Sequence, residues 1–278
     1  MKRILTIQDI SCVGKCSLTV ALPIISAMGV EAAVIPTAVL STHTMFSGFT
    51  FHDLTGEITP ITEHWKKEKI DFDAIYTGYL GSFEQLALVD NIFDDFKTND
   101  NLIIIDPVMG DAGKLYKGFS QEFAFSMAKL CGKADVILPN LTEAAYMLGE
   151  DYIGASYTES DIKVLLQRLC ALGAKTAVIT GVSLEEGRVG VMALDGKSGE
   201  YFYYDREHLP AAYHGTGDIY ASTFTGAVSR GYTVNESLKI ATDYTVECIK
   251  LTLEDKNGRD YGVNFEQAIP FLVKRIGE

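Results

Sequence analysis

The chain has 278 residues, of which 47% are hydrophobic, and a formal net charge of −13 from 24 basic and 37 acidic side chains. This length and composition allow a large buried core. The acidic excess argues against a nucleic-acid partner, although a few local cations could still hold a nucleotide. The longest apolar run, 18–30, is too short to span a bilayer, so we expect a buried helix and no membrane partner. The N-terminal residues lead directly into a strand-like run without a signal-peptide pattern, and we expect a cytoplasmic protein.

Strand-like and helix-like segments alternate along the first two thirds of the chain. Apolar runs bounded by Gly, Pro or Asp are typical of buried strands, and the segments between most of them are typical of helices. The alternation predicts a three-layer α/β/α fold with a mainly parallel central sheet, in a single domain covering 1–278. The expected strands are 3–8, 32–39, 73–77, 102–106, 135–138 and 175–180, and the expected helices are 15–28, 83–97, 119–131, 142–149 and 159–172.

The pattern changes after residue 187. Two short strands, 188–194 and 199–204, flank Asp-Gly-Lys-Ser and predict a hairpin at the sheet edge. The last third returns to helix, where apolar or small residues from Val234 onward form a stripe that we interpret as core packing.

A glycine turn opens onto a helix at residues 214–222, His-Gly-Thr-Gly-Asp-Ile-Tyr-Ala-Ser. Gly215 and Gly217 would let the backbone approach an anion, and the start of the helix would favour negative charge there. Asp218 would then be placed to take a proton from an attacking hydroxyl. A capped helix start explains the same residues about as well, because an Asp in a first helical turn is favourable on electrostatic grounds alone.

Two further segments carry polar groups at expected strand ends. Asp106 and Asp111 stand five residues apart after an apolar strand, where they could hold a metal ion or simply form a surface turn. Asn140 and Glu143 have the spacing of a helix-capping pair, which does not exclude a role in a metal and phosphate network.

Gly14-Lys15-Cys16-Ser17 superficially suggests a phosphate-binding P-loop. The pattern fails, because Asp9 stands where a glycine is needed and Cys16 stands where Ser or Thr is needed. We interpret Cys12 and Cys16 as buried free thiols near a strand-to-helix turn.

Seven segments, taken in order, resemble the pyridoxal kinase branch of the ribokinase-like superfamily. The resemblance covers residues 6–222 and implies a ribokinase-like fold without a large lid domain. The segments are Thr-Ile-Gln-Asp (6–9), Ser-Thr-His-Thr-Met-Phe (41–46), Thr-Gly-Tyr-Leu-Gly-Ser (77–82), Asp-Pro-Val-Met-Gly-Asp (106–111), Pro-Asn-Leu-Thr-Glu-Ala (139–144), Val-Ile-Thr-Gly (178–181) and Gly-Thr-Gly-Asp (215–218).

The resemblance also implies roles for individual residues. Asp218 would be the catalytic base, supported by the backbone of Gly215, Thr216 and Gly217. MgATP would be the phosphoryl donor, with a monovalent cation as a further candidate. The residues implied for the nucleotide are Asp106, Asp111, Lys114, Thr180, Gly181 and Gly217, and those implied for the metal are Asp106, Asp111, Asn140 and Glu143.

The vitamer pocket implied by the resemblance contains His43, Thr44, Phe46 and Tyr79, which suit a planar pyridine ring. Asp9 departs from the family pattern, which commonly has Ser at this position. A carboxylate there would favour a protonated ring nitrogen or a cationic amine, although it could also accept from a hydroxymethyl group or cap the following helix.

The expected activity is ATP-dependent phosphorylation of the 5′-hydroxymethyl group of pyridoxal, pyridoxamine or pyridoxine, in salvage of pyridoxal 5′-phosphate. The alternatives are a hydroxymethylpyrimidine kinase of thiamin synthesis and a vitamer-binding protein without catalysis. The resemblance further implies a homodimer.

Overall fold

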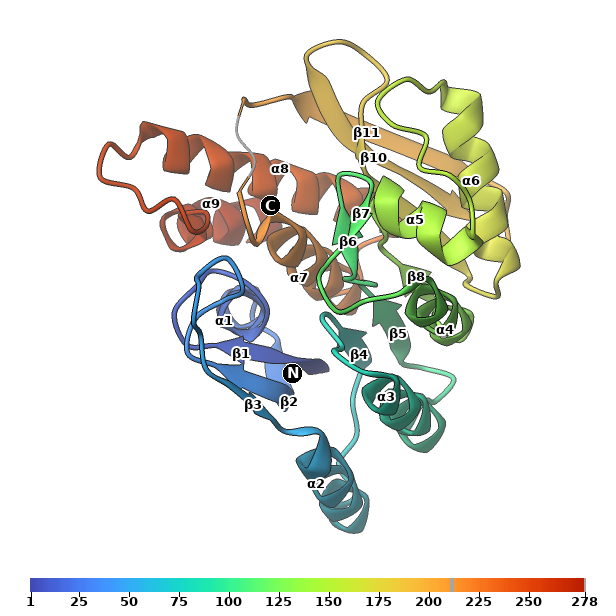
Figure 1. Cartoon of the computed structure of the whole chain (residues 1–278), viewed down its shortest axis with the longest axis vertical. Helices are drawn as coiled ribbons and strands as arrows, with labels where there is room; N and C mark the ends of the chain where they lie inside the picture. The colour runs from blue at the N-terminus through green and yellow to red at the C-terminus, as the bar shows by residue number, and fades with distance from the viewer. Residues whose placement is uncertain (211–212, 278) are drawn as a thin grey trace. The chain divides into compact units, whose positions relative to one another are not determined.

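The computed structural model describes residues 1–210 and 213–277. It contains two compact units, a first unit formed by 1–78 with 209–278 and a second unit formed by 79–208. Figure 1 labels the helices and strands of both units and colours them by residue number.

The first unit holds four neighbouring strands in the order β4-β1-β2-β3. β1 pairs in parallel with β2 and β4, whereas the short β3 pairs antiparallel with β2. Helix α1 packs on β1 and β2, α2 packs on β2, and α7 contacts β4. The elements are β1 (Arg3–Ser11), α1 (Leu18–Ala27), β2 (Glu31–Leu40), β3 (Phe51–Asp53), α2 (Thr55–Glu68), β4 (Ala74–Thr77), α7 (Thr216–Ser229), α8 (Val234–Glu254) and α9 (Phe265–Gly277).

The second unit holds five neighbouring strands in the order β11-β10-β9-β8-β5. β5, β8 and β9 are parallel, and the β10–β11 hairpin adds two antiparallel strands. Helix α6 packs on β9 and β10, and α5 packs on β9. The elements are α3 (Phe83–Phe96), β5 (Leu102–Ile105), β6 (Gly110–Asp111), β7 (Lys114–Leu115), α4 (Gln121–Cys131), β8 (Val136–Ile137), α5 (Leu141–Leu148), α6 (Glu159–Ala171), β9 (Thr176–Val182), β10 (Arg188–Asp195) and β11 (Tyr201–Glu207).

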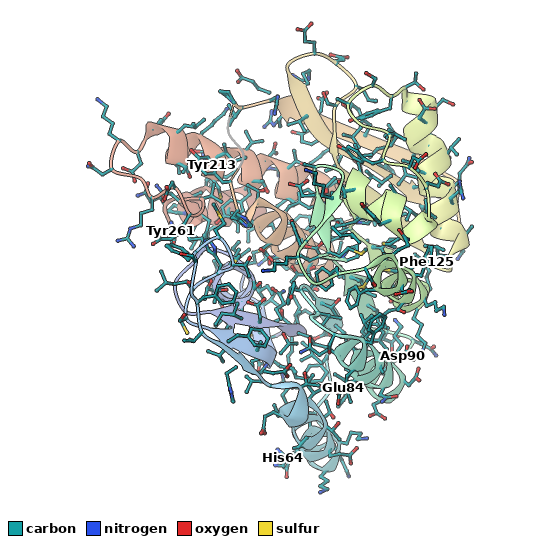
Figure 2. All side chains as sticks on the ribbon, viewed as in Figure 1. His64, Glu84, Asp90, Phe125, Tyr213 and Tyr261 are labelled. Carbon is teal, nitrogen blue, oxygen red and sulfur yellow. The ribbon has the colours of Figure 1, made fainter. Side chains whose placement is uncertain are left out.

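These elements confirm the predicted three-layer α/β/α class with a mainly parallel sheet, the edge hairpin, and the order of the predicted strands and helices. Helix α2 and the short strands β3, β6 and β7 were not predicted, and α9 was predicted only as part of the helical last third, without bounds. Pro60 and Pro270 lie inside α2 and α9, where proline usually argues against a helix. The side chain of His64 on α2, labelled in Figure 2, is 69% exposed, as expected for the outer face of a helix.

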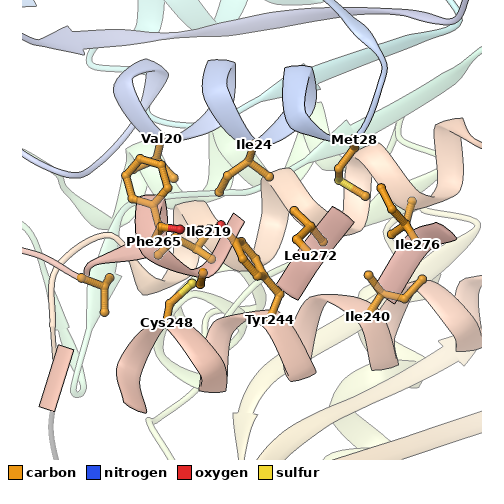
Figure 3. Packing of buried hydrophobic residues seen from close by; sticks show 13 residues of the cluster. Val20, Ile24, Met28, Ile219, Ile240, Tyr244, Cys248, Phe265, Leu272 and Ile276 are labelled. Atoms are coloured by element: carbon orange, nitrogen blue, oxygen red, sulfur yellow. Dashed lines mark hydrogen bonds between the residues drawn. The ribbon is translucent and has the colours of Figure 1, made fainter. Parts of the chain in front are cut away.

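Packing of buried side chains fixes the helices of the first unit against one another. Val20 and Ile24 of α1, with Met28 directly after it, belong to one buried cluster with Ile219 of α7 and Tyr244 of α8 (Figure 3). Each large apolar side chain buried in this way contributes about 1.5–3 kcal/mol. Because α1 and α7 share this cluster, the loops that lead into the two helices are held in place together.

The stripe predicted on the last third of the chain is buried, since Leu238, Ala241 and Cys248 on α8 are fully buried, and Cys248 belongs to the same cluster. In the chain outside 211–212 and 278, no helix has the length and apolar character needed to cross a bilayer.

Candidate active site

The glycine turn before α7 has a backbone conformation that favours glycine. Gly215 is the N-cap of α7 and lies in the left-handed region, with φ 83°. A Cβ at this position would lie 1.8 Å from the carbonyl oxygen of Lys15, so no side chain fits there. The turn therefore brings the Lys15–Ser17 loop against the start of a 14-residue helix, where exposed N–H groups favour negative charge.

Asp218 lies in the first turn of α7 and keeps part of its surface exposed. Burial of the carboxyl group raises its pKa to about 7. A hydrogen bond from the Ser17 backbone N–H opposes this shift, and the nearby charge of Asp9 adds to it. An aspartate with a pKa near neutrality can accept a proton from a hydroxyl and release it again.

Asp9 lies on β1 where the pairing with β2 shifts between Gln8 and Ile10. Its carboxylate accepts a hydrogen bond from the Ser17 hydroxyl at 2.6 Å and another from the Ser11 hydroxyl at 3.3 Å. The residue is 5% exposed, and burial raises its pKa. Interpreting Asp9 as a helix cap was wrong, because it lies within a strand and Ser17 occupies the N-cap position of α1.

An aromatic cluster surrounds His43 in the same unit. Its ring centroid lies 5.1 Å from that of Phe46, 5.4 Å from that of His214 and 6.0 Å from that of Tyr261. Nδ1 of His43 accepts from the backbone N–H of Met45, so Nε2 carries the hydrogen that it donates to the Tyr261 carbonyl at 2.8 Å. With both nitrogens engaged and the residue only 3% exposed, His43 offers a ligand no nitrogen.

Thr44, next to His43, is exposed. The sequence did not indicate Tyr261, labelled in Figure 2, which comes from the segment between α8 and α9. His214 could have been noticed, because it immediately precedes the glycine turn.

Lys15 joins the two segments on either side of a polar cleft in the first unit. Its Nζ donates to Asn264 Oδ1 and Glu266 Oε2, both at 2.9 Å. The cleft has a volume of about 450 Å³ and is also lined by Cys12 and Arg259. Cys12 is exposed, contrary to the expectation of a buried thiol, and Cys16 is partly exposed.

In the second unit, Glu143 holds the loop that carries Asp106 and Asp111. Its two carboxyl oxygens accept from the backbone N–H groups of Met109 at 3.1 Å and Asn140 at 2.9 Å. The Asn140 side chain accepts from the Glu143 N–H and donates to the Gly110 carbonyl, so the predicted capping pair is confirmed. Burial raises the pKa of Glu143 to about 8.

The carboxylates of this loop are in different settings. Asp106 is buried directly after β5, whereas Asp111 is exposed on β6 and accepts from the Ala112 N–H. Lys114, on the paired strand β7, is also exposed. Such hard oxygen donors fit Mg²⁺, which usually takes one or two carboxylates together with phosphate oxygens and water. In the described ranges, no three His, Cys, Asp or Glu side chains gather into a metal site of their own.

Thr180 lies on β9 and forms an isolated parallel bridge with Asn140. Its N–H donates to the Pro139 carbonyl, and Gly181 follows with φ 74°. These contacts place Thr180 and Gly181 beside the start of α5. Tyr79 is partly exposed, and its ring centroid lies 5.6 Å from that of Phe119.

Within each unit, the structure brings several predicted residues together. Asp9 accepts from the Ser17 hydroxyl, Asp9 and Ser17 both influence the pKa of Asp218, and His43 contacts Phe46. In the second unit Asn140 links the loop of Asp106 to Thr180. Sequence reasoning missed Ser11 and Ser17, for which residue types alone gave no signal.

Known proteins that are similar in sequence and structure have the same fold. The family model for phosphomethylpyrimidine kinase matches residues 21–262. A crystal structure of pyridoxal kinase from Lactobacillus plantarum is 34% identical, with a TM-score of 0.90, and covers 99% of this chain and 97% of that chain.

A provisionally named phosphomethylpyrimidine kinase from Bacteroides thetaiotaomicron, crystallised with pyridoxal, is 40% identical, with a TM-score of 0.92. That comparison covers 98% of this chain and 95% of the other. Pyridoxine kinase from Bacillus subtilis is 29% identical over 185 residues, which span 65% of each chain.

Proposed function

Because the chain belongs to the phosphomethylpyrimidine kinase family, within the ribokinase-like kinases that include pyridoxal kinases, we propose that it transfers the γ-phosphoryl group of ATP to a vitamin B6 vitamer. The acceptor is the 5′-hydroxymethyl oxygen of pyridoxal, pyridoxamine or pyridoxine. The products are the vitamer 5′-phosphate and ADP, as in salvage of pyridoxal 5′-phosphate.

The observation that carries this proposal is Asp218, a carboxyl with a raised pKa directly behind the left-handed turn at Gly215. The vitamer oxygen attacks the γ-phosphorus and gives its proton to Asp218, while the bond from that phosphorus to the β–γ bridging oxygen breaks. The backbone N–H groups of Gly215, Thr216, Gly217 and Asp218 stabilise the charge on the group in transfer.

The roles proposed for the vitamer ring follow the family resemblance. In the first unit, His43 and Phe46 are the proposed aromatic contacts and Thr44 a polar one. In the second unit, Tyr79 is the proposed stacking residue. Because both nitrogens of His43 are engaged, we expect it to select for ring shape and not for a hydrogen-bond pattern. A negative charge at Asp9 would additionally favour cationic vitamers.

The nucleotide phosphates are assigned to Lys114, Thr180, Gly181 and Gly217. Mg²⁺ bound with the nucleotide would neutralise phosphate charge. Asp106, Asp111 and Asn140 offer oxygen atoms to the metal or its water ligands. Glu143 would act by holding their loop, since both of its oxygens already accept backbone hydrogen bonds. A monovalent cation is a further candidate ligand.

A single kinase domain covering 1–278 is part of the proposal and is supported by the family match, which runs through both units. We also propose that the protein is a homodimer and is located in the cytoplasm.

Phosphorylation of a hydroxymethylpyrimidine is the second candidate, because a hydroxymethylpyrimidine/phosphomethylpyrimidine kinase from Aquifex aeolicus is 25% identical over 219 residues. The machinery would be the same and only the ring pocket would differ. A vitamer-binding protein without catalysis is less well supported, since it would not need the intact Gly-Thr-Gly-Asp turn.

A panel assay tests the proposal. ATP consumption with Mg²⁺ is measured on pyridoxal, pyridoxine, pyridoxamine and the aminopyrimidine alcohol, with product masses recorded. Turnover on a B6 vitamer supports the proposal, and turnover on the pyrimidine alone would favour the second candidate. No turnover on any of the four would favour a binding protein.

A further inference from the structure

The loop that leads into α1 contains the Gly-Lys-Cys-Ser stretch that superficially suggests a phosphate-binding loop. In the structure its lysine is bound within the protein. The ammonium group of Lys15 donates to Asn264 Oδ1 and to Glu266 Oε2, both at 2.9 Å. These partners stand 249 and 251 positions further along the chain, where α9 begins. Lys15 therefore joins the start of the first helix in this unit to the start of the last.

Asn264 is a fixed anchor for this contact. It is 7% exposed, its side-chain nitrogen donates to Asp255 at 2.9 Å, and its backbone N–H donates to the Thr252 hydroxyl on α8 at 2.8 Å. The aliphatic part of Lys15 packs against Gly262, where an added Cβ would lie 2.6 Å from the Cβ of the lysine. The Lys15 side chain is only 16% exposed, so its position is defined along its whole length.

The backbone of the same lysine supports the glycine turn before α7. A Cβ on Gly215 would overlap the Lys15 carbonyl oxygen, so the two backbones are in direct contact. The Gly215 carbonyl accepts from the Ile219 N–H at 3.0 Å, which closes the first turn of the helix. The N–H groups that this turn leaves free are those proposed to stabilise the phosphoryl group in transfer. Lys15 thus connects the anion-binding turn to the start of α9.

The segment that anchors Lys15 also holds His43. The Tyr261 carbonyl accepts from Nε2 of His43 at 2.8 Å, and the ring centroids of Phe46 and Tyr261 lie 5.5 Å apart. A Cβ on Gly14, next to Lys15, would overlap the His43 ring. The loop before α1, the 43–46 segment and the segment after α8 are therefore packed together.

We propose that Lys15 is a positioning residue for the turn at 215–218. Its ammonium group ties the loop before α1 to the start of α9, and its carbonyl then holds the turn in the conformation that receives the phosphoryl group. Lys15 acts through the turn and is not itself a phosphate ligand. The catalytic consequence rests on the proposed function, whereas the tether itself belongs to the resting protein.

The test breaks the tether in two ways, each with a matched control. Lys15→Met removes the ammonium group and keeps the apolar stem, and Lys2→Met makes the same change at the ion pair with Asp73 in the same unit, whose distance is 2.8 Å. Glu266→Lys leaves Lys15 in place but sets a like charge beside it, in the first turn of α9. Glu57→Lys reverses an exposed glutamate in the first turn of α2.

Amide hydrogen exchange, followed by NMR, measures the turn without any substrate. The Ile219 amide reports whether the turn is closed, and the Met28 amide, which donates to the Ile24 carbonyl at the other end of α1, reports on general stability. We expect exchange at Ile219 to be at least about threefold faster in Lys15→Met and in Glu266→Lys, with exchange at Met28 nearly unchanged. The double variant should add little, because both changes remove the same contact. Both controls should match wild type.

Three results would overturn the proposal. The first is wild-type exchange at Ile219 in both tether variants. The second is equal acceleration at Ile219 and Met28, which would indicate general destabilisation. The third is acceleration in Lys15→Met alone, since the lysine would then act without its partner on α9.

Steady-state kinetics give a second readout. A displaced turn should lower kcat about tenfold in both tether variants, with KM for ATP altered less than about twofold, because its N–H groups act on charge that develops in the transition state. A raised KM for ATP in Lys15→Met alone, with kcat kept, would identify a phosphate ligand and contradict the proposal. Absence of turnover in wild type would count against the proposed function alone, since hydrogen exchange needs no substrate.

Discussion

Asp218 in the first unit and Asp135 in the second are aspartates placed at the start of a secondary-structure element in opposite electrostatic settings. Burial would raise the pKa of Asp135, but hydrogen bonds from Lys175 and Lys97, each at 2.7 Å, and from the Ile103 N–H outweigh it and hold the pKa below its ordinary value. Asp218 has the reverse balance, because burial dominates and its charged neighbour is another carboxylate.

The difference distinguishes a carboxylate that stabilises the fold from one suited to proton transfer. Asp135 joins β8 to lysines 97 and 175, so its ionised form favours the folded chain. Burial outweighs the Ser17 N–H that lowers the pKa of Asp218, so the folded chain favours the protonated form. Perturbed groups of this second kind are enriched at functional sites.

Asp218→Asn should have the largest effect on activity. Loss of the general base should lower kcat by roughly 10² to 10⁴, with little change in stability at neutral pH, because the amide keeps the shape of the side chain. Steady-state kinetics on the preferred vitamer, with circular dichroism melts, measure both effects. Near-normal turnover would remove Asp218 from the role of base.

Gly215→Ala should damage both the turn and the fold. A Cβ there would meet the Lys15 carbonyl, and φ would remain positive, so we expect a loss of about 2 kcal/mol in unfolding free energy and at least a tenfold loss of kcat. Gly217→Ala is the matched stability control, because a Cβ at that position meets no atom within 4 Å. Equal stability of the two variants in urea melts would contradict this account.

Asp135→Asn should lower the unfolding free energy at pH 7 by about 2 kcal/mol, because Lys97 loses its charged partner. The pKa of Asp135 is lowered in the folded state, so the advantage of wild type is present above the ordinary value of 3.8 and is lost as pH falls through the native pKa. Urea melts at several pH values measure this. A difference that persisted at pH 2 would contradict the ion-pair explanation.

Lys175→Ala should have the smallest effect, about 0.5 kcal/mol, because the lysine side chain is 72% exposed and well solvated. The same melts measure it, and added salt should reduce the difference further. A loss as large as that of Asp135→Asn would show that Lys175 and not Lys97 is the principal partner.

Much of the fold could be predicted from the sequence because it depends on local patterns. The buried strand β5 is a continuous apolar run, β9 has an apolar centre, and the cap at Asn140 is set by spacing alone. Helix α2 was missed because it contains Pro60 and buries only Thr55, Ile58 and Thr62, so its sequence shows little of the apolar pattern of a helix. Pro23 did not hide α1, whose sequence is largely apolar.

The site was predictable where one short segment carries it, as in the Gly-Thr-Gly-Asp turn. It was not predictable where distant residues converge. His43 bonds to Tyr261, 218 positions away, and the role of Ser17 depends on a backbone conformation that residue type would argue against. Asp9 could be recognised as a departure from the family pattern, but its serine partners required the structure.

The most direct test of the account is the pH dependence of kcat/KM for wild type, measured from pH 5 to pH 9 with saturating MgATP on pyridoxal and on pyridoxine. Two vitamers are needed because their own ionisations differ, whereas a limb due to the enzyme stays in place. We predict a rise in activity through about pH 7 with both vitamers, which matches the pKa of Asp218. A profile that is flat across this range, or a limb that moves with the vitamer, would contradict the assignment of Asp218 as the base.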